Sequence, residues 1–456
     1  MSQLCAVIDI GKTNVKIHVV DEVYDSLFCR SRTNQVIEPG IYPHYDIHAL
    51  WRWIRGTLTE VARDFHIDVI AITTHGATAA LVHPGAGESG LVMPVMDYEF
   101  EGGASESDYD AVRPPFSETY SPALPAGLNL GRQLFWQQRY CERAFDDAVY
   151  ILPYPQYWAW RLTGVAVSEV TSWGCHTDLW APAKRDYSTL VDHLGIRSKL
   201  PPLVPAGTVV GNVSEEVAGQ TGLSRECRVI AGLHDSNASY LRYLSREEKS
   251  PLTVVSTGTW VISFSSATPL AVLDEERDML ANVDINGVPV ACARFMGGRE
   301  FEMICRRTGS KPEDRIGSEA LQGLVDKQVF ALPDFSEGSG PFGGRPPQIV
   351  GKADSGAALA SLYCALMIDY ELDLLASEGD LIIEGAWLRN PMLCAVLAQL
   401  RPVQQVLLST DETGTVSGAA QLAFGDKLAA PVLESIEAAS VSGLENYRSR
   451  WRALLE

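Results

Sequence analysis

The chain has 456 residues, which is more than one hydrophobic core usually supports, so two large domains are expected. Hydrophobic residues make up 46% of it, and its formal net charge of -20 argues against a nucleic acid or an anionic membrane surface as a partner. Nine cysteines without a Cys-x-x-Cys pair predict reduced thiols, and the lack of a leader or of an apolar run of membrane length predicts a cytoplasmic location.

The first motif is the polar stretch DIGKTNVK at residues 9–16, which lies between apolar runs at residues 4–8 and 15–20. This pattern predicts a strand, a glycine turn and a returning strand. A nucleotide phosphate chain needs such a turn, because glycine lets backbone N–H groups approach closely and short polar or basic side chains complete the site. The candidate phosphate ligands are Gly11, Lys12, Thr13, Asn14 and Lys16.

Asp9 stands at the end of the first expected strand, beside this turn. A carboxylate there can hold Mg²⁺ directly or through water, because this ion prefers oxygen ligands and keeps several waters. The alternative for the whole stretch is an ordinary β-hairpin with a solvated polar turn, since short hairpins with glycine turns are common.

A third strand is expected at residues 26–33. Asp46 then stands where a helix cap would, and apolar residues recur at helical spacing from residue 50 to residue 65. A buried strand at residues 69–73 leads into His75. Loops beyond the carboxyl ends of strands hold ligands in open α/β sheets, so His75 is either a substrate contact or a buried loop histidine.

Residues 81–82 and 91–95 are expected to pair as a hairpin that brings Asp97 to the same sheet edge as His75. Residues 101–129 are rich in proline and small polar residues, which predicts a long surface loop or lid.

Helices are expected at residues 132–145 and 157–162, with a proline turn at residues 153–156 between them. The run TSWGCHTDLW at residues 171–180 is polar and aromatic together. Its composition is typical of a face that binds a sugar and equally of a packed aromatic loop.

A strongly apolar strand at residues 229–231 runs into GLHDSNASY at residues 232–240. Asp235 is thereby placed at a strand end and at the start of a helix of small residues. A carboxylate in this position can act as a general base, and the helix N-terminus can bind an anion. The alternative is that Asp235 only caps its helix.

The opening pattern then recurs, with an apolar run at residues 253–255, a polar glycine turn at residues 256–259 and a returning strand at residues 260–264. Two copies separated by about half the chain predict an internally duplicated architecture with one turn from each half facing a shared cleft. A third hairpin is expected at residues 282–294, around Asn286-Gly287.

The last part of the chain predicts a helix at residues 357–376 and a buried strand at residues 381–383 that ends in Glu384-Gly385-Ala386. Asn390 followed by proline is a good cap and first helical residue, so a helix N-terminus should face that loop. A final strand is expected at residues 405–408, followed by a helix at residues 415–424.

Taken together, these motifs resemble the FGGY carbohydrate kinases of the actin-like ATPase superfamily, over about residues 4–424. DIGKTNVK is similar to the first phosphate loop of that family, and STGT at residues 256–259 is similar to the second. His234-Asp235 resembles its catalytic step. The adenosine-binding segment is matched by EGAWLRNP at residues 384–391 and TGTVSGAA at residues 413–420.

STGTW, Asn282 and RFMGGREFE at residues 294–302 resemble the rhamnulose and fuculose kinase branch more than the glycerol kinases. Two departures stand out. The adenosine segment begins Gly385-Ala386-Trp387 where the family usually has two or three glycines, so a differently shaped adenine pocket is expected. The loop at His75 carries over only His75 and Gly76 from the longer motif of many xylulose and ribulose kinases.

The resemblance implies an α/β fold of two actin-like (ribonuclease H-like) ATPase domains with a central interdomain cleft. Residues 1–244 would bind the sugar and carry the first phosphate loop, and residues 245–456 would bind ATP. The implied reaction is MgATP-dependent phosphoryl transfer to a primary hydroxyl of a ketose. That ketose would be a 6-deoxyketohexose such as rhamnulose or fuculose, or a ketopentose such as ribulose or xylulose, and a homodimer is compatible with it.

The resemblance also implies roles for individual residues. Asp235 would accept the hydroxyl proton and Asp9 would position Mg²⁺. The implied sugar ligands are His75, Gly76, Asp97, His234 and Asn237. The implied ATP ligands are Gly11, Lys12, Thr13, Asn14, Lys16, Thr257, Gly258, Thr259, Gly385, Ala386 and Asn390.

Two other functions remain as alternatives on the sequence. A sugar-responsive regulatory protein could keep this fold and lose turnover. A chaperone-like or cytoskeletal ATPase of the same superfamily would need a peptide-binding domain or a polymer interface, and residues 425–456 are too few for an appended peptide-binding domain.

Overall fold

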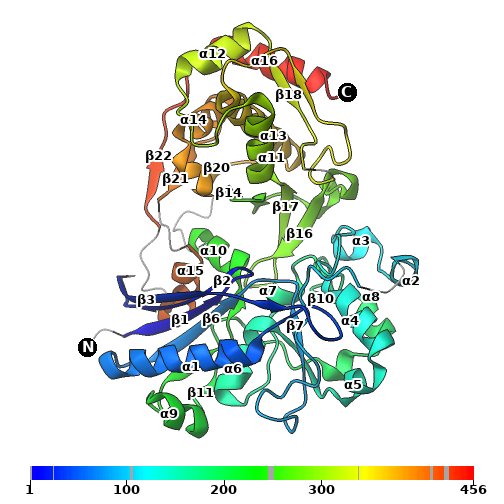
Figure 1. Cartoon of the computed structure of the whole chain (residues 1–456), viewed down its shortest axis with the longest axis vertical. Helices are drawn as coiled ribbons and strands as arrows, with labels where there is room; N and C mark the ends of the chain where they lie inside the picture. Colours follow the sequence, from blue (N-terminus) through cyan, green and yellow to red (C-terminus); the bar gives the residue numbers. More distant parts are fainter. Residues whose placement is uncertain are drawn as a thin grey trace. The chain divides into compact units, whose positions relative to one another are not determined.

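The computed structural model describes residues 3–23, 25–102, 106–244, 251–336, 338–410, 414–425 and 431–456. They form two compact units (Figure 1), and the chain enters each unit more than once. The first unit is made of Met1–Glu247, Ala281–Pro289 and Thr413–Ala430, and the second of Glu248–Leu280, Val290–Glu412 and Pro431–Glu456. The assignment of sugar binding to residues 1–244 and of ATP binding to residues 245–456 stays a prediction.

The first unit contains a mixed sheet with the strand order β11-β12-β6-β1-β2-β3, and β13 also pairs with β6. Its strands are β1 (Cys5–Ile10), β2 (Asn14–Val20), β3 (Ser26–Thr33), β6 (Val69–Thr74), β11 (Val209–Asn212), β12 (Arg228–Ile230) and β13 (Leu233–His234). The strand predicted at residues 26–33 is therefore confirmed. The two strands predicted at residues 4–8 and 15–20 are present, but β1 continues to Ile10 and β2 begins at Asn14.

The second unit contains a mixed sheet with the order β16-β17-β15-β14-β20-β21-β22. Its strands are β14 (Leu252–Thr257), β15 (Val261–Ser265), β16 (Met279–Val283), β17 (Pro289–Phe295), β20 (Asp380–Gly385), β21 (Val406–Ser409) and β22 (Leu433–Ser435). The last three residues of β16, from Ala281 to Val283, belong to the short segment that clusters with the first unit.

The two sheets repeat one topology, which confirms the predicted internal duplication. β1 lies antiparallel to β2 and parallel to β6, and β14 lies antiparallel to β15 and parallel to β20. The next strands outward also correspond, because β2–β3 matches β15–β17 and β6–β12 matches β20–β21 in direction. Each sheet thus places one glycine turn at the end of its central strand.

Helix α1 (Ile47–Asp64) covers one face of the first sheet, and Figure 1 shows it in blue beside α6. The helix begins as predicted at Asp46, whose carboxylate accepts the N–H of Ala49 at 2.9 Å. The other helices of this unit are α2 (Glu106–Asp110), α3 (Phe116–Thr119), α4 (Leu130–Tyr140), α5 (Glu142–Asp147), α6 (Tyr154–Thr163), α7 (Val170–Trp173), α8 (Thr189–His193), α9 (Glu215–Thr221), α10 (Asp235–Leu244) and α15 (Gly414–Phe424). The short strands are β4 (Val36–Ile37), β5 (His44–Tyr45), β7 (Ala79–Val82), β8 (Tyr150–Pro153), β9 (Trp180–Ala181) and β10 (Asp186–Tyr187).

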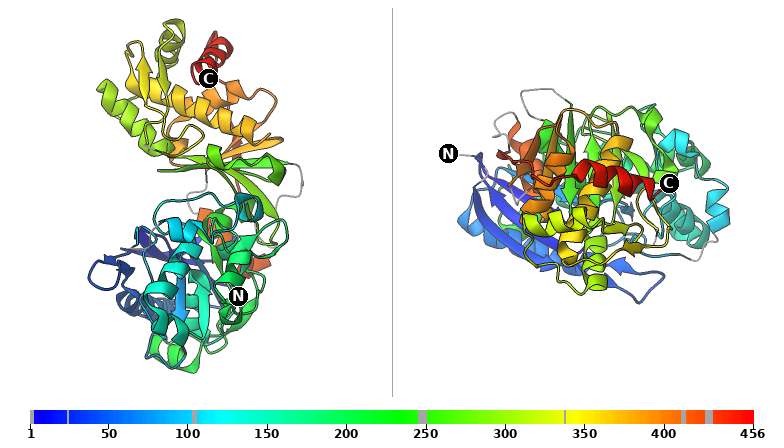
Figure 2. Two further views of the ribbon diagram at one scale, coloured as in Figure 1. Left: turned by 90° about the vertical axis from the view of Figure 1, so that its right-hand side faces the viewer. Right: turned by 90° about the horizontal axis from the view of Figure 1, so that it is seen from above.

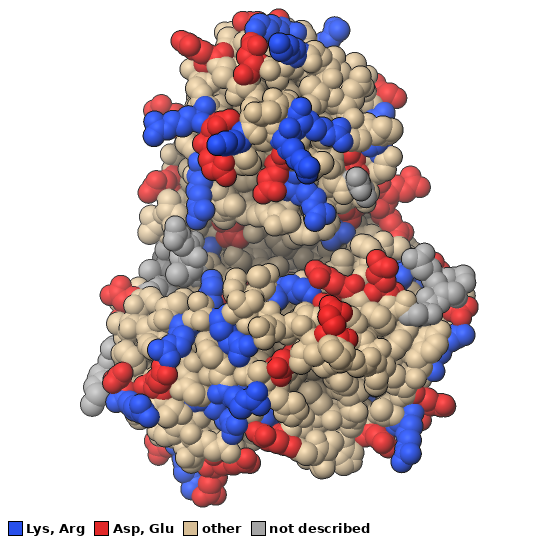
Figure 3. Space-filling view, in the orientation of Figure 1, with Lys and Arg blue, Asp and Glu red and all other residues tan. Residues whose placement is uncertain are grey.

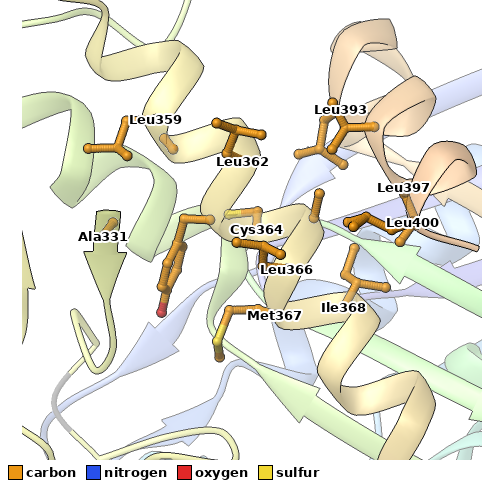
Figure 4. Packing of buried hydrophobic residues seen from close by; sticks show 14 of the residues in the cluster. Ala331, Leu359, Leu362, Cys364, Leu366, Met367, Ile368, Leu393, Leu397 and Leu400 are labelled. Atoms are coloured by element: carbon orange, nitrogen blue, oxygen red, sulfur yellow. The ribbon is translucent and has the colours of Figure 1, made fainter. Parts of the chain in front are cut away.

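Helix α13 (Gly356–Leu374) lies at the centre of the core of the second unit. Figure 4 shows Ile368 of α13 on the side of Leu397 and Leu400 of α14 (Pro391–Leu400) and Leu359 on the other side of the helix. The yellow helix can be followed beside its sheet in Figure 2. The helix predicted at residues 357–376 is confirmed as α13, and it is buried on nearly all sides. The remaining elements are α11 (Gly297–Thr308), α12 (Ser318–Asp326), α16 (Leu444–Ala453), β18 (Phe330–Leu332) and β19 (Gln348–Val350).

The hairpin predicted for residues 81–95 is wrong in its pairing. Strand β7 pairs with β8 instead, and only a single bridge joins Val82 to Leu91. Pro94 interrupts the second predicted strand, and proline cannot donate to a strand ladder. Asp97 is nevertheless delivered to the region of His75, because Tyr98 packs against the His75 ring.

Three further expectations need correction. The predicted loop at 101–129 contains the short helices α2 and α3, and residues such as Leu124 are buried. The predicted helix 132–145 is broken at Cys141 into α4 and α5. The predicted proline turn at residues 153–156 is instead the start of α6, where Pro155 is the second residue, because the first helical turn tolerates a residue without an N–H group.

Residues 425–456 were considered only as too few for an appended domain, and no element was predicted there, yet they carry β22 and α16. Helix α16 buries Tyr447 and Trp451 in the core of the second unit. No helix of the described ranges is long and apolar enough to cross a membrane. On the face shown in Figure 3, basic and acidic side chains are interspersed over both units.

Candidate active site

The first glycine turn is closed by its own backbone and by Asn34. The Gly11 N–H donates to the Asn14 carbonyl at 2.9 Å, and a Cβ at position 11 would lie 3.0 Å from that oxygen. Asn34 donates its side-chain amide to the Gly11 carbonyl at 3.0 Å and its backbone N–H to the Thr13 carbonyl at 2.8 Å. The side chains of Thr13 and Asn14 remain exposed, as a phosphate ligand requires. Asn34 was missed because it lies in an irregular loop with no motif.

Asp9 lies on β1, where its register partners are Lys16 on β2 and Thr73 on β6. Burial and the negative charge of Asp235 raise the pKa of Asp9 to about 7, and Lys16 opposes this shift. A divalent cation would relieve the same repulsion, so the site fits Mg²⁺. Among the residues that the structure describes, no group of three or more His, Cys, Asp or Glu could hold a metal ion. The protein would therefore supply few ligands, which is usual where substrate phosphates bind the ion.

The side chain of Lys12 points toward Asp97. Its ammonium forms an ion pair with Asp97 and lies 3.3 Å from a carboxylate oxygen of Glu99. The ammonium also lies 4.6 Å from the centre of the Tyr98 ring. Asp97 is buried, and its Oδ1 accepts the hydroxyl of Tyr45 at 3.2 Å.

His75 lies in an aromatic cage on the first unit. Its ring centre is 5.1 Å from Tyr45, 5.5 Å from Tyr98 and 5.1 Å from Tyr154. Nδ1 lies 3.1 Å from the Gly76 carbonyl, which accepts an N–H, so the other nitrogen is an acceptor. Burial lowers the pKa of His75 to about 4, and Nε2 has no hydrogen-bond partner among the described residues. A neutral imidazole with a free acceptor can receive a hydroxyl group.

Asp235 is the first residue of α10 and keeps 28% of its side chain exposed. Its Oδ1 accepts the Ser236 N–H at 2.7 Å and lies 3.2 Å from Nε2 of His234. Nδ1 of His234 lies 2.9 Å from Oδ1 of Asn237, whose amide donates to the Val283 carbonyl. Asn237 is thus fully engaged inside the protein, and it orients His234 against Asp235.

The charge of His234 is set by its surroundings. Burial favours the neutral ring, but the neighbouring Cys175 thiol, 3.9 Å away, and Asp235 outweigh it and raise the pKa of His234. Gly76 is required beside it, because a Cβ at that position would lie 2.6 Å from Nε2 of His234. The His75-Gly76 loop therefore joins the aromatic cage to the His234-Asp235 pair.

The run 171–180 extends from α7 to the start of β9, and it is packed inside the first unit, since Trp173 and Trp180 are buried. It still serves the site, because the Thr171 hydroxyl accepts the backbone N–H of His234 at 3.0 Å and donates to Glu169 at 2.5 Å. Glu169 is completely buried, and burial raises its pKa to about 7. No sequence motif marks Glu169, and only its place two residues before Thr171 could have indicated a capping role.

The second glycine turn repeats the first. The Gly258 N–H donates to the Trp260 carbonyl at 2.8 Å, and the Thr259 carbonyl accepts the Gly298 N–H at 3.2 Å. A Cβ on Gly298 would lie 2.4 Å from the Gly258 carbonyl oxygen. The hydroxyl of Thr257 donates to the Glu384 carbonyl at 2.5 Å and accepts the Trp387 N–H at 3.0 Å. Thr257 therefore links the turn to the segment that follows β20.

That segment borders a cavity of about 560 Å³ on the second unit, large enough for a nucleoside. Gly385 has a φ of +89°, and a Cβ there would lie 2.2 Å from the Thr257 carbonyl oxygen. Asn390 caps α14 by accepting the Leu393 N–H at 3.1 Å and donates to Ser361 at 2.8 Å, so its side chain shapes the wall. Residues lining the cavity include Phe301, Arg315, Ala386, Trp387, Arg389 and Asn390. Thr413 of the predicted adenosine segment lies outside the described residues.

Family models match both parts of the chain. The model described as FGGY family of carbohydrate kinases, N-terminal domain, matches residues 126–241, and the one described as carbohydrate kinase FGGY, C-terminal domain, matches residues 249–431. The crystal structure of a carbohydrate kinase from Novosphingobium aromaticivorans is 36% identical, covers 100% of this chain and 98% of that chain, and superposes with a TM-score of 0.92.

The fold is the two-domain actin-like fold, as the resemblance implied. A ligand-bound xylulose kinase from Lactobacillus acidophilus shares it, with a TM-score of 0.78 and 13% identity over 99% of this chain and 96% of that one. The chain belongs to the FGGY family of carbohydrate kinases.

Two curated relatives align over a shorter part. A putative sugar kinase, YoaC of Bacillus subtilis, is 25% identical over 284 residues, which is 59% of this chain and 54% of that protein. L-fuculokinase of Escherichia coli is 26% identical over 275 residues, which is 57% of this chain and 56% of that protein. The chain thus spans about half the length of the curated relatives it matches.

Proposed function

We propose that this chain is an ATP-dependent sugar kinase that transfers the γ-phosphoryl group to a primary hydroxyl of a ketose. The observation that carries the proposal is Asp235, a partly exposed carboxylate at the start of α10 that His234 holds from one side. Phosphoryl transfer leaves little covalent work for a protein, so one oriented base, a cation site and two phosphate turns are sufficient.

In this mechanism Asp235 accepts the proton of the attacking hydroxyl. His234 and Asn237 act as positioning residues, because their side chains face Asp235 and the Val283 carbonyl. His75, Gly76 and Asp97 are the proposed contacts of the sugar. Mg²⁺, held at Asp9, would neutralise the phosphate charge.

The proposed phosphate ligands lie on both units. On the first unit they are the turn residues Gly11, Thr13 and Asn14 together with Lys16. On the second unit they are Gly258 and Thr259, which Thr257 supports, and the cavity beside Gly385, Ala386 and Asn390 would take the adenosine. The wall contributed by Trp387 is consistent with a differently shaped adenine pocket.

The acceptor is proposed to be a 6-deoxyketohexose or a ketopentose, since both classes carry a primary hydroxyl. The similarity to L-fuculokinase supports the first class, and the likeness of fold to xylulose kinases supports the second. A homodimer and a cytoplasmic location belong to the same proposal.

The test is a coupled assay of ADP release with L-fuculose, L-rhamnulose, L-xylulose, D-xylulose and D-ribulose, with aldoses and polyols as comparison compounds. ADP release with one ketose, abolished by EDTA and restored by MgCl₂, is the expected result. If the chain binds MgATP tightly but phosphorylates none of these compounds, the result would favour a sugar-responsive regulatory protein that has lost catalytic activity. Steady ATP consumption without any sugar would favour an ATPase of a different kind.

A further inference from the structure

We propose that Lys12 belongs to the sugar-binding side of the site and is not a phosphate ligand. Its place in the first glycine turn would assign it to the nucleotide on sequence grounds. Its contacts point elsewhere, because the described groups that contact its ammonium belong to the Asp97 region or to the aromatic cage. The inference rests on the proposed function and refines it.

The ammonium of Lys12 is held by two carboxylates and two rings. It pairs with Asp97, lies 3.3 Å from Glu99, and lies 4.6 Å and 5.5 Å from the ring centres of Tyr98 and Tyr45. Ion pairing with the carboxylates and cation–π attraction to the rings both stabilise the Lys12 ammonium in this position. All of these groups lie on the first unit.

Moving Lys12 toward a phosphate would be costly. Asp97 is 5% exposed, and Lys12 supplies the positive charge in contact with it. Removing that partner would leave a carboxylate buried without its counter-ion, which is strongly unfavourable. Tyr45 donates one neutral hydrogen bond to the same oxygen and cannot replace the charge.

Lys16 provides the contrast. It is exposed on β2, directly across the strand pair from Asp9, and its charge lowers the pKa of that carboxyl. The cation next to the candidate Mg²⁺ position is therefore Lys16. The two lysines of this motif therefore have different roles, because Lys16 faces the nucleotide and Lys12 faces the sugar.

The Lys12 cluster also defines the kind of substrate. It combines one ammonium with two carboxylates, and the neutral acceptor Nε2 of His75 stands in the same cage through Tyr45 and Tyr98. A fixed carboxylate and a neutral imidazole accept hydroxyl groups, whereas the excess negative charge repels a carboxylate. The cluster fits an uncharged polyhydroxy compound rather than a sugar acid.

The experiment compares Lys12→Met with Lys16→Met, two substitutions of similar size and charge loss. The dissociation constant of MgADP is measured by calorimetry, and the KM for the ketose is measured with the acceptor found in the screen. Lys12→Met should raise the ketose KM by about ten- to a hundred-fold and change MgADP affinity less than two-fold. Lys16→Met should weaken MgADP binding by tenfold or more.

The MgADP measurement needs no sugar, so it remains decisive for Lys12 even if the screen finds no acceptor. A tenfold loss of MgADP affinity in Lys12→Met, or an unchanged ketose KM, would overturn the inference. If Lys12→Met does not fold, Asp97→Asn removes the other side of the pair and should give the same division between sugar and nucleotide. When Lys12→Met and Asp97→Asn are combined, their effects on the ketose KM should not add, because each change alone already breaks the ion pair between Lys12 and Asp97.

Discussion

At the scale of single residues, a carboxylate at the start of α10 can act as a base or as a cap, and one substitution separates the two. Asn keeps the size of Asp235 and ranks with it as a helix cap, but it cannot take a proton. If Asp235 is the general base, Asp235→Asn should lower kcat by about 10² to 10⁴. Sugar affinity should change much less, because the amide can still bond a hydroxyl.

Steady-state kinetics and calorimetric binding of the ketose to the same preparation provide the measurement for Asp235→Asn. Ser236→Ala is a useful control, since it alters a neighbouring side chain that donates weakly to the same carboxylate at 3.4 Å. Near-normal turnover in folded Asp235→Asn would reduce Asp235 to a helix cap and remove the catalytic assignment.

The buried Glu169 makes stability depend on pH. Burial raises its pKa to about 7, whereas an unfolded glutamate titrates near pH 4.3. Between these values the folded protein keeps a proton that the unfolded chain has lost, so the contribution of Glu169 to stability falls as the pH rises through this window. Glu169→Gln has no such proton. Its stability relative to the natural protein should therefore rise between pH 5 and pH 8, by about 1–3 kcal/mol.

Unfolding by urea at pH 5, 6, 7 and 8 measures this difference for Glu169→Gln. The glutamine oxygen can still accept from Thr171, so the fold around His234 is retained. A constant stability difference between the two proteins over this range would show that Glu169 is ionised throughout, and the pKa argument would fail.

At the scale of elements, the sequence predicted the features that depend on residues close together in the chain. The caps Asp46 and Asn390 and both glycine turns were predictable, because each depends on contacts within a few residues. The pairing of β7 with β8 was not, since its partners lie about seventy residues apart in the chain. The ion pair of Lys12 with Asp97 and the hydrogen bond of Asn237 to the Val283 carbonyl could not be predicted either, because these partners also lie far apart in the chain.

The contact between α10 and α15 is an element-scale feature with a direct test. Figure 1 shows the two helices together in the first unit, and their buried residues share one core cluster. A Cβ at Gly418 of α15 would lie 1.7 Å from the Ala238 carbonyl of α10. Gly418→Ala must therefore push the helices apart and should destabilise the protein by about 1–3 kcal/mol.

Gly219→Ala is the matched control, because no atom of the described residues lies within 4 Å of a Cβ at that position in α9. Alanine is the better helix former, so this variant should be as stable as the natural protein or more so, by up to about 1 kcal/mol. The measurement is the urea midpoint of each variant. Because α10 begins at Asp235, Gly418→Ala should also lower kcat, and equal stability of both variants would refute the close contact.

At the scale of the whole molecule, each unit has its own sheet and its own core, although neither is one continuous piece of chain. Ala281–Pro289 and the segment with α15 both belong to the first unit, and Asn237 bonds to the Val283 carbonyl of the first of them. A boundary placed at residue 244 from the sequence cannot represent this, because composition does not show where the chain returns.

Separate cores lead to a last prediction, that heating unfolds the molecule in two overlapping steps. Proteins with more than one domain often depart from two-state behaviour, and a ligand stabilises the unit that binds it. MgADP at about a hundred times its dissociation constant adds about 2.7 kcal/mol to the free energy of unfolding of the unit that binds it. The midpoint temperature at which the second unit unfolds should therefore rise by roughly 5–10 °C. The ketose should raise the step of the first unit instead. Differential scanning calorimetry measures both.

Two variants assign the steps to the units. Trp451 is fully buried in the core of the second unit and Leu58 in the core of the first. Trp451→Ala should therefore destabilise the second unit, and Leu58→Ala the first, by about 2–5 kcal/mol. Each variant should lower the midpoint of one unfolding step and leave the midpoint of the other unchanged. The step lowered in Trp451→Ala should be the one that MgADP raises. If MgADP raises the step that Leu58→Ala lowers, the nucleotide binds chiefly to the first unit, and the cavity beside Ala386 loses its assignment.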